Sequence, residues 1–552
     1  MLGDWVGNYA NVLCINSWQV KKYIDVYSAS SIIGFSAEDL LHLSELYHQA
    51  EESWAHIKAS IPCRNETCDS LLPVLTRQID AYLSFLSAVV ELARSKWTEF
   101  NLKLMGIGLG IMFLSLLFIL LSMQKVIKLL IVSGHGRFGF SFELGVAIMM
   151  VAIRACSFLS NSYILEEGKV ASFLLATSGI FKLRHSIITD KKFSEAILFL
   201  LVNLILRFSI EVGLSKQAAT SLFMSVSSSW TLGITSGHPF WTFCSQLGPI
   251  LALLFVAWWL YQFISPCTRG AWDYIVFLAL LSYLLIVVLW ISESSADTTT
   301  LFQSIGKTYI PRMIYAIGLF QLFLIAFVSL IGKEKHLNSE RNLVMKALAL
   351  LSTWSPTIIL LSGKQGSWVA LASLAGGYCI ARLGSNEEDG VDGTSGSWAF
   401  DPLSVTQWSL LAVCLFFATG HWCAFDGLRY GAAFIGFDEF ILVRQAVLLA
   451  IDTFGFSHIL PMLGLPLLLA AAQEGKSLDQ TNHRRSFSWQ LSLGYMTYGL
   501  ITTVAVTLTT MCVAIQRRHL MVWGLFAPKF VFDVVGLLLT DTVICVASLF
   551  YF

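Results

Sequence analysis

The sequence feature that most constrains the fold is a stretch of twenty uncharged residues, Leu104–Met123, which reads LMGIGLGIMFLSLLFILLSM. As an α-helix, this stretch is long enough to cross the hydrocarbon core of a bilayer. Comparable apolar stretches follow through the rest of the chain. The sequence therefore predicts a protein built for lipid from about residue 104 onward, with soluble chemistry confined to the first hundred residues or to short loops.

The composition agrees with a membrane protein. Hydrophobic residues make up 56% of the 552 residues and charged residues 13%, whereas soluble domains carry about 25% charged residues. The formal net charge of zero gives no reason to expect a nucleic-acid partner. We predict an all-α fold, in which a lumenal helical hairpin or stalk (residues 1–100) precedes a polytopic membrane helix bundle (residues 101–552).

We predict about thirteen membrane spans, give or take two. The polar, glycine-rich segment 383–404 is predicted to be a flexible loop between two of them. The last apolar stretch is long enough for two elements broken at Pro528. The predicted spans are Leu104–Met123, Phe140–Ile164, Val170–Leu183, Ala196–Ile210, Leu247–Ser265, Tyr274–Ser292, Met313–Ile331, Ala347–Ser362, Gly366–Ala381, Thr406–Gly420, Phe440–Phe454, Ile459–Ala472, Ser488–Gln516 and Met521–Phe552.

The spacing of apolar residues in the first hundred positions predicts two amphipathic helices joined by a polar loop. Ser36 is a suitable N-cap for the first helix, and the second begins near Leu71. The loop between them contains Cys63 and Cys68, which form either a disulfide in an oxidising compartment or two free thiols. It also contains a glycosylation acceptor at Asn65.

The distribution of charge in the loops predicts the orientation in the membrane. Lys125 follows the first span, the acidic pair Glu166 and Glu167 follows the second, and Arg184 follows the third. Because basic loops stay on the cytosolic side, this alternation predicts that the first hundred residues are lumenal. The glycosylation acceptor at Asn65 independently indicates that the first hundred residues are lumenal.

Motifs of soluble catalysis are not found in the sequence: there is no glycine-rich phosphate loop, His-Glu-x-x-His pair or nucleophile elbow. We therefore predict neither a catalytic residue nor a metal ligand. Ionisable residues within apolar stretches are the stronger signal, because burying charge in lipid is costly. They are densest over residues 420–458, where we predict a lipid head-group site formed by His421, Asp426, Arg429 and Arg444. The alternative is that these residues form ion pairs between helices or reach toward the membrane surface.

Two strings in the second half go beyond these general patterns. The string Phe416–His421 (FFATGH), with Ala432–Gly436 (AAFIG), resembles a signature of the GPI ethanolamine phosphate transferases. The strings Arg518–Trp523 (RHLMVW) and Phe526–Phe530 (FAPKF) are similar to a second block of that family. Residues 15–30 resemble the segment that follows the family's catalytic domain, and the likeness is greatest to GPI ethanolamine phosphate transferase 2 in its plant form.

The resemblance implies an endoplasmic-reticulum membrane protein of GPI-anchor biosynthesis. Such enzymes transfer phosphoethanolamine from phosphatidylethanolamine to a mannose of the GPI precursor, using a lumenal alkaline-phosphatase-like domain with a threonine nucleophile and zinc. The resemblance covers the part after that domain, so we expect no cofactor in this chain and no transferase activity from it alone. Expected partners are the two lipids and a small hydrophobic membrane subunit. Two alternatives are a multi-pass lipid transporter or scramblase, and a scaffold for a small membrane subunit.

Overall fold

In the computed structural model, every regular element of the described residues is a helix, which confirms the predicted all-α class. The chain divides into two compact units, Met1–Met105 and Gly106–Phe552, which are described separately below. The residues that the structure describes are 2–30, 35–60, 68–97, 101–132, 142–189, 192–220, 239–264, 271–294, 300–331, 339–384, 402–471, 480–517 and 521–551.

The first unit contains three long helices: α1 (Leu2–Ser30), α2 (Ala37–Ser60) and α3 (Cys68–Trp97). The sequence analysis predicted α2 and α3 but missed α1, so the predicted hairpin is a three-helix unit. The buried residues of α1 do recur at helical spacing, at Ala10, Leu13, Ser17 and Ile24. Exposed tyrosine, tryptophan and valine side chains on its other face hide that pattern in the sequence.

Polar side chains join the three helices around Glu51 of α2. The Tyr82 hydroxyl of α3 donates to Glu51 Oε1 at 3.1 Å, and the Cys14 thiol of α1 lies 3.6 Å from the same oxygen. Gln78 Nε2 donates to the carbonyl oxygen of Ala50 at 2.7 Å. Burial is the main reason why the pKa of Tyr82 is raised, so this hydroxyl remains a donor.

Two sequence predictions in this unit, the cysteine pair and the glycosylation site, stay untested by the structure. Cys63 and Asn65 lie outside the described residues, and Cys68 opens α3 without a described side chain. The cysteine pair and the glycosylation site are therefore still predictions.

The second unit is a bundle of helices that vary widely in length. Five of them, α5, α6, α15, α16 and α17, have fewer than eighteen residues. The helices are α4 (Leu102–Val132), α5 (Phe142–Ser157), α6 (Asn161–Leu165), α7 (Glu167–Thr189), α8 (Phe193–Thr220), α10 (Pro239–Ile264), α11 (Ala271–Ser294), α12 (Thr300–Ile331), α13 (Ser339–Ser362), α14 (Lys364–Gly384), α15 (Pro402–Ala418), α16 (Leu442–Phe454), α17 (Leu460–Ala471), α18 (Gln480–Ile515) and α19 (Ala527–Tyr551).

Eight helical segments among the described residues are long and apolar enough to cross a membrane. Shorter apolar helices occur at Leu247–Gln262 and Pro402–Ala418. The multi-pass prediction is therefore confirmed, while the predicted number of spans is not tested. Apolar side chains cover much of the outer surface of this unit, as expected for a protein whose solvent is lipid.

Two details of the second unit differ from the sequence prediction. The break expected at Pro528 is absent, because a π-helical turn (Val522–Phe526) continues directly into α19. Pro528 is the second residue of α19, directly after the π-helical turn, and the helix passes through it without a break. The loop predicted at 383–404 is shorter at both ends, since α14 extends to Gly384 and α15 begins at Pro402; residues 385–401 are outside the described ranges.

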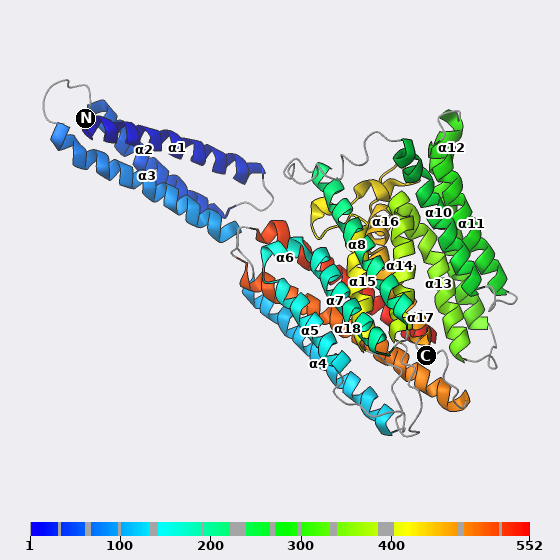
Figure 1. Cartoon of the computed structure of the whole chain (residues 1–552). Coiled ribbons are helices and arrows are strands. Elements are labelled where there is room, and N and C mark those ends of the chain that lie inside the picture. The colour runs from blue at the N-terminus through cyan, green and yellow to red at the C-terminus, as the bar shows by residue number, and fades with distance from the viewer. Residues whose placement is uncertain are drawn as a thin grey trace. The chain divides into compact units, whose positions relative to one another are not determined.

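The centre of the second unit is α15. Each of its residues except Pro402, Trp408 and Val413 is buried. It packs against α5, α7, α8, α14 and α18, and Figure 1 shows it in yellow beside α7, α8 and α14. Polar groups in its interior find partners within the bundle: Gln407 Nε2 donates to Ser178 Oγ of α7 at 2.9 Å, and Thr406 Oγ1 donates to the carbonyl oxygen of Pro402 at 2.9 Å.

Small residues let the helices approach α15 closely. The indole of Trp408 lies between Gly377 of α14 and Gly464 of α17, where a Cβ would fall 2.6 and 3.0 Å from ring atoms. The indole N–H donates to the carbonyl oxygen of Pro461 at 2.9 Å. Glycine is therefore required for close packing at both positions.

We predict that Gly377→Ala lowers stability in detergent by about 1–3 kcal/mol, because the new methyl group overlaps the Trp408 ring. Thermal unfolding followed by tryptophan fluorescence measures the effect. Gly106→Ala in α4 is the matched control, since no atom lies within 4 Å of its Cβ position. A control that unfolds earlier than Gly377→Ala would contradict this packing.

Candidate functional site

A segment of irregular backbone, residues 419–441, lies between α15 and α16; it contains the AAFIG string and the second half of FFATGH, whose first half ends α15. It contains two short 3₁₀ turns, η2 (Phe425–Gly427) and η3 (Tyr430–Phe434). Gly420 and Gly436 have φ angles of +85° and +83°. Residues with a Cβ are strained in that region, so glycine is the residue that fits both turns.

A buried histidine cluster, formed by Thr419, His421, Arg429 and Asp452, ties this segment to the bundle. His421 Nε2 lies 3.1 Å from Asp452 Oδ2 on α16, and its Nδ1 lies 2.8 Å from Thr419 Oγ1. Arg429 donates two hydrogen bonds to the same carboxylate: its Nε donates to Oδ2 at 3.1 Å, and its Nη2 donates to Oδ1. Fork-shaped pairing of this kind gives a strong and directional contact.

The remaining donors of Arg429 also bond to protein atoms. Its Nη1 donates to the carbonyl oxygen of Ser362 at 3.3 Å, and its Nη2 donates to that of Leu361 at 3.1 Å. These two carbonyls belong to the C-terminal turn of α13, which has no intrahelical donors for them. Burial lowers the pKa of His421, so Arg429 is the main charge that compensates Asp452.

A second cluster, the lysine cluster, is formed by Arg154, Glu167, Lys529 and Asp533. Lys529 Nζ lies 2.7 Å from Glu167 Oε2 and 2.7 Å from Asp533 Oδ1. Arg154 Nη2 lies 2.9 Å from Glu167 Oε1. The side chains of Glu167 and Lys529 are only 2% and 3% exposed, so two cations and two anions compensate each other away from solvent.

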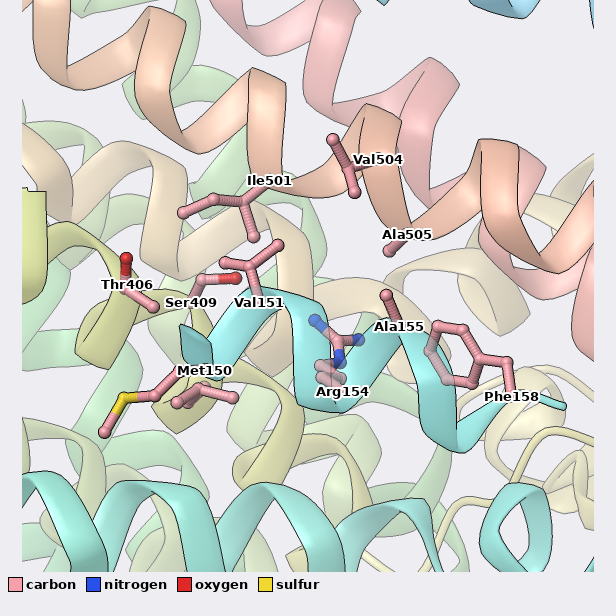
Figure 2. A pocket seen from close by; sticks show the side chains of 11 residues that line it. Met150, Val151, Arg154, Ala155, Phe158, Thr406, Ser409, Ile501, Val504 and Ala505 are labelled. Atoms are coloured by element: carbon pink, nitrogen blue, oxygen red, sulfur yellow. The ribbon is translucent and has the colours of Figure 1, made fainter. Parts of the chain in front are cut away.

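Two cavities adjoin the lysine cluster and share Arg154 as a lining residue. The smaller has a volume of about 10 Å³, and Figure 2 shows it between α5 and α18, with Ser409 of α15 at its edge. The larger, of about 70 Å³, reaches Cys423 and His458 as well as the charged groups. Apolar side chains form most of its lining, but the charged groups at one part give it polar partners, and its volume is large enough for several water molecules.

The structure unites only part of the predicted head-group set. His421 and Arg429 share one carboxylate, whereas Asp426 is exposed in η2. Arg444 is separate from the histidine cluster and lies over the ring of Phe437 at 4.0 Å. The role of these residues in lipid binding is untested.

Sequence reasoning did not identify Asp452, Glu167 and Lys529 as central residues. All three border or interrupt apolar stretches, and that was the available signal. Periodicity does not show which ionisable residues of distant helices meet. Among the residues that the structure describes, no three His, Cys, Asp or Glu side chains are grouped to hold a metal ion.

Comparison with known proteins identifies similar sequences among the GPI ethanolamine phosphate transferases. The chain is 29% identical over 183 residues to human GPI ethanolamine phosphate transferase 3, catalytic subunit, a match that covers 27% of this chain and 16% of the human protein. The mouse protein of that name is 30% identical over 176 residues, which covers 25% of this chain and 16% of the mouse protein. GPI ethanolamine phosphate transferase 3 of Saccharomyces cerevisiae is 31% identical over 137 residues, or 24% of this chain and 13% of the yeast protein.

These matches span about a sixth of the length of the curated relatives. No family model matches the chain, and no solved structure matches it. The matches support the family resemblance, and they extend to a quarter of this chain.

We predict that Asp452→Ala destabilises the protein by about 3–5 kcal/mol, because it leaves Arg429 without its buried counter-charge. Thermal unfolding and monodispersity in detergent measure the loss. Asp426→Ala is the matched control: it also removes one carboxylate from this region, but from an exposed side chain, and it should change stability by less than about 0.5 kcal/mol. Equal effects of the two substitutions would contradict a central role for Asp452.

Proposed function

We propose that this chain acts in GPI-anchor biosynthesis as the membrane part of an ethanolamine phosphate transferase. The observation that carries the proposal is the similarity to three curated transferases, in a chain whose described part is a multi-pass helix bundle. The membrane part would bind phosphatidylethanolamine and the GPI precursor and present them to a lumenal active site.

The position of the two clusters supports this proposal. The histidine cluster includes Thr419 and His421 of the FFATGH string, and the lysine cluster includes Lys529 of the FAPKF string. The strings that carry the family resemblance therefore coincide with the charged interior of the bundle. A bundle held by such interior pairs can keep a defined lipid-binding surface.

Several finer assignments belong to the same proposal. The chain would reside in the endoplasmic-reticulum membrane with its N-terminal unit in the lumen, next to a small hydrophobic subunit. The segment 15–30 favours transferase type 2, whereas the matched relatives carry the name type 3. We also propose that the chain alone transfers no phosphoethanolamine, because its sequence contains no motif of a phosphatase-type site.

Head-group binding near residues 419–441 is also part of this proposal. Two of the four predicted residues, His421 and Arg429, direct their polar atoms at protein partners. A phosphate bound by them would have to displace Asp452, which is costly. These two residues therefore suit a role in holding the segment in place, and Arg444 is better placed to contact a lipid.

The proposal predicts that loss of the chain in its native cells causes GPI precursors to accumulate without one of their ethanolamine phosphates. Mass spectrometry of the precursors identifies the affected mannose and so distinguishes type 2 from type 3. Re-expression of the chain should restore the normal precursors where the cells also supply the lumenal active site, which the chain alone does not provide. Normal precursors, together with an altered distribution of phospholipids between leaflets, would instead favour the transporter or scramblase.

The proposed orientation predicts that Asn65 carries an N-glycan in cells. Endoglycosidase treatment should increase electrophoretic mobility, and Asn65→Gln should abolish the shift. Asn101→Gln, which alters an asparagine outside any Asn-x-Ser/Thr sequence, is the control. A glycan that persists in Asn65→Gln would contradict this site.

A further inference from the structure

The segment Ile435–Phe437 is fixed against the first half of α12. Arg312 Nε donates to the carbonyl oxygen of Gly436 at 2.7 Å, and the Tyr315 hydroxyl donates to that of Ile435 at 3.2 Å. The Tyr315 and Phe437 rings stack at 6.0 Å with an angle of 11° between their planes. Phe437 is thus held in a fixed position.

Two arginines from different helices lie against the ring of Phe437. The guanidinium carbon of Arg312 is 5.0 Å from the ring centroid, and that of Arg444 on α16 is 4.0 Å from it. The two carbons are therefore no more than about 9 Å apart. The Phe437 ring therefore brings two permanently charged guanidinium groups, the donors that suit phosphate oxygens best, to one place.

Neither arginine has an acidic side chain as its partner among the described residues. The polar contacts of Arg312 and Arg444 are to the backbone oxygens of Gly436 and Glu439, and Arg444 Nε is buried without a hydrogen-bond partner. The acidic residues close by in sequence, Asp438 and Glu439, have exposed side chains. Donors for an anion are thus available at this place.

The surroundings of the two arginines favour a lipid over a free ion. Arg444 lies two residues inside a candidate membrane span that begins at Leu442, which places it near a membrane boundary. Large apolar side chains next to the arginines are 50% or more exposed, and they can contact acyl chains. They are Tyr309, Met313, Phe440, Ile441, Leu442 and Val443.

We propose that Arg312, Phe437 and Arg444 form a binding site for the phosphate of a membrane glycerophospholipid. The two guanidinium groups bind the phosphate oxygens, Phe437 aligns both groups, and the apolar rim contacts the acyl chains. Because Asp438 and Glu439 are adjacent in sequence, a zwitterionic head group suits the site better than one with net negative charge. The site concerns any such lipid and does not rest on the proposed transferase role.

Titration of the purified full chain in detergent with short-chain phosphatidylcholine tests the site. Native mass spectrometry and ligand-induced thermal stabilisation measure binding. Arg312→Gln combined with Arg444→Gln should weaken binding at least about tenfold, because charge-assisted hydrogen bonds are lost. Arg184→Gln removes an exposed arginine of α7 and should bind as the unchanged protein does.

Two further measurements complete the test. One asks whether the site binds the phosphate of a lipid or free phosphate, and the other asks whether binding needs the two-donor geometry of arginine. Diacylglycerol of the same chain length and inorganic phosphate should each bind at least tenfold more weakly than the phospholipid. Arg444→Lys keeps the charge but loses bidentate geometry, and it should weaken binding even if the double variant does not fold. Unchanged affinity in Arg444→Lys and the double variant, or inorganic phosphate binding as tightly as the lipid, would overturn the proposal. A loss of transferase function leaves these binding results unaffected, so the two proposals fail separately.

Discussion

Charge in the interior of a membrane bundle must be compensated by protein, because lipid offers no hydrogen bonds and no counter-ions. Two clusters meet this constraint in different ways. Asp452 is enclosed by Arg429 and His421, while Lys529 joins Glu167 to Asp533. The first cluster fixes an irregular segment to α13 and α16, and the second connects α5, α7 and α19. The arrangement of the central helices depends on these few contacts, because apolar packing alone is nearly as favourable with lipid as with another helix.

How much of the fold the sequence predicts depends on whether each helix is marked by residues that are neighbours in the chain. Helices such as α4 and α11 were predicted because a run of about twenty apolar residues is a local signal with few alternative explanations. The helix α1 was missed because its polar and aromatic residues obscure a narrow buried face. The turn before α19 was misjudged because proline was interpreted as a break, whereas it occupies the first turn of a helix.

The candidate site was predictable only in part. Sequence analysis predicted that the ionisable residues at 420–458 form a functional site, and the pair formed by His421 and Asp452 lies within that interval. The lysine cluster joins residues that are several hundred positions apart, and nothing in local periodicity brings Glu167 to Lys529. Sequence analysis did not single out Arg312, because its proposed role depends on contact with Phe437, which is distant in sequence and close only in the folded chain. The comparisons support similarity to the GPI ethanolamine phosphate transferases over about a quarter of the chain. The activity of the protein is a question for experiment.

The π-helical turn at Gly455–Ile459 separates α16 from α17 and lies between the two clusters. Such a turn holds one residue more than an α-turn, so removing a single residue there would leave an ordinary α-turn and keep the orientation of the helices on both sides, whereas removing one from a regular helix would rotate everything beyond it by about 100°. Asp452 precedes this turn, whereas His458, which lines the larger cavity, lies within it. The π turn is thus the point between α16 and α17 at which the helix can lose one residue while Asp452 and the residues of α17 keep their packing faces.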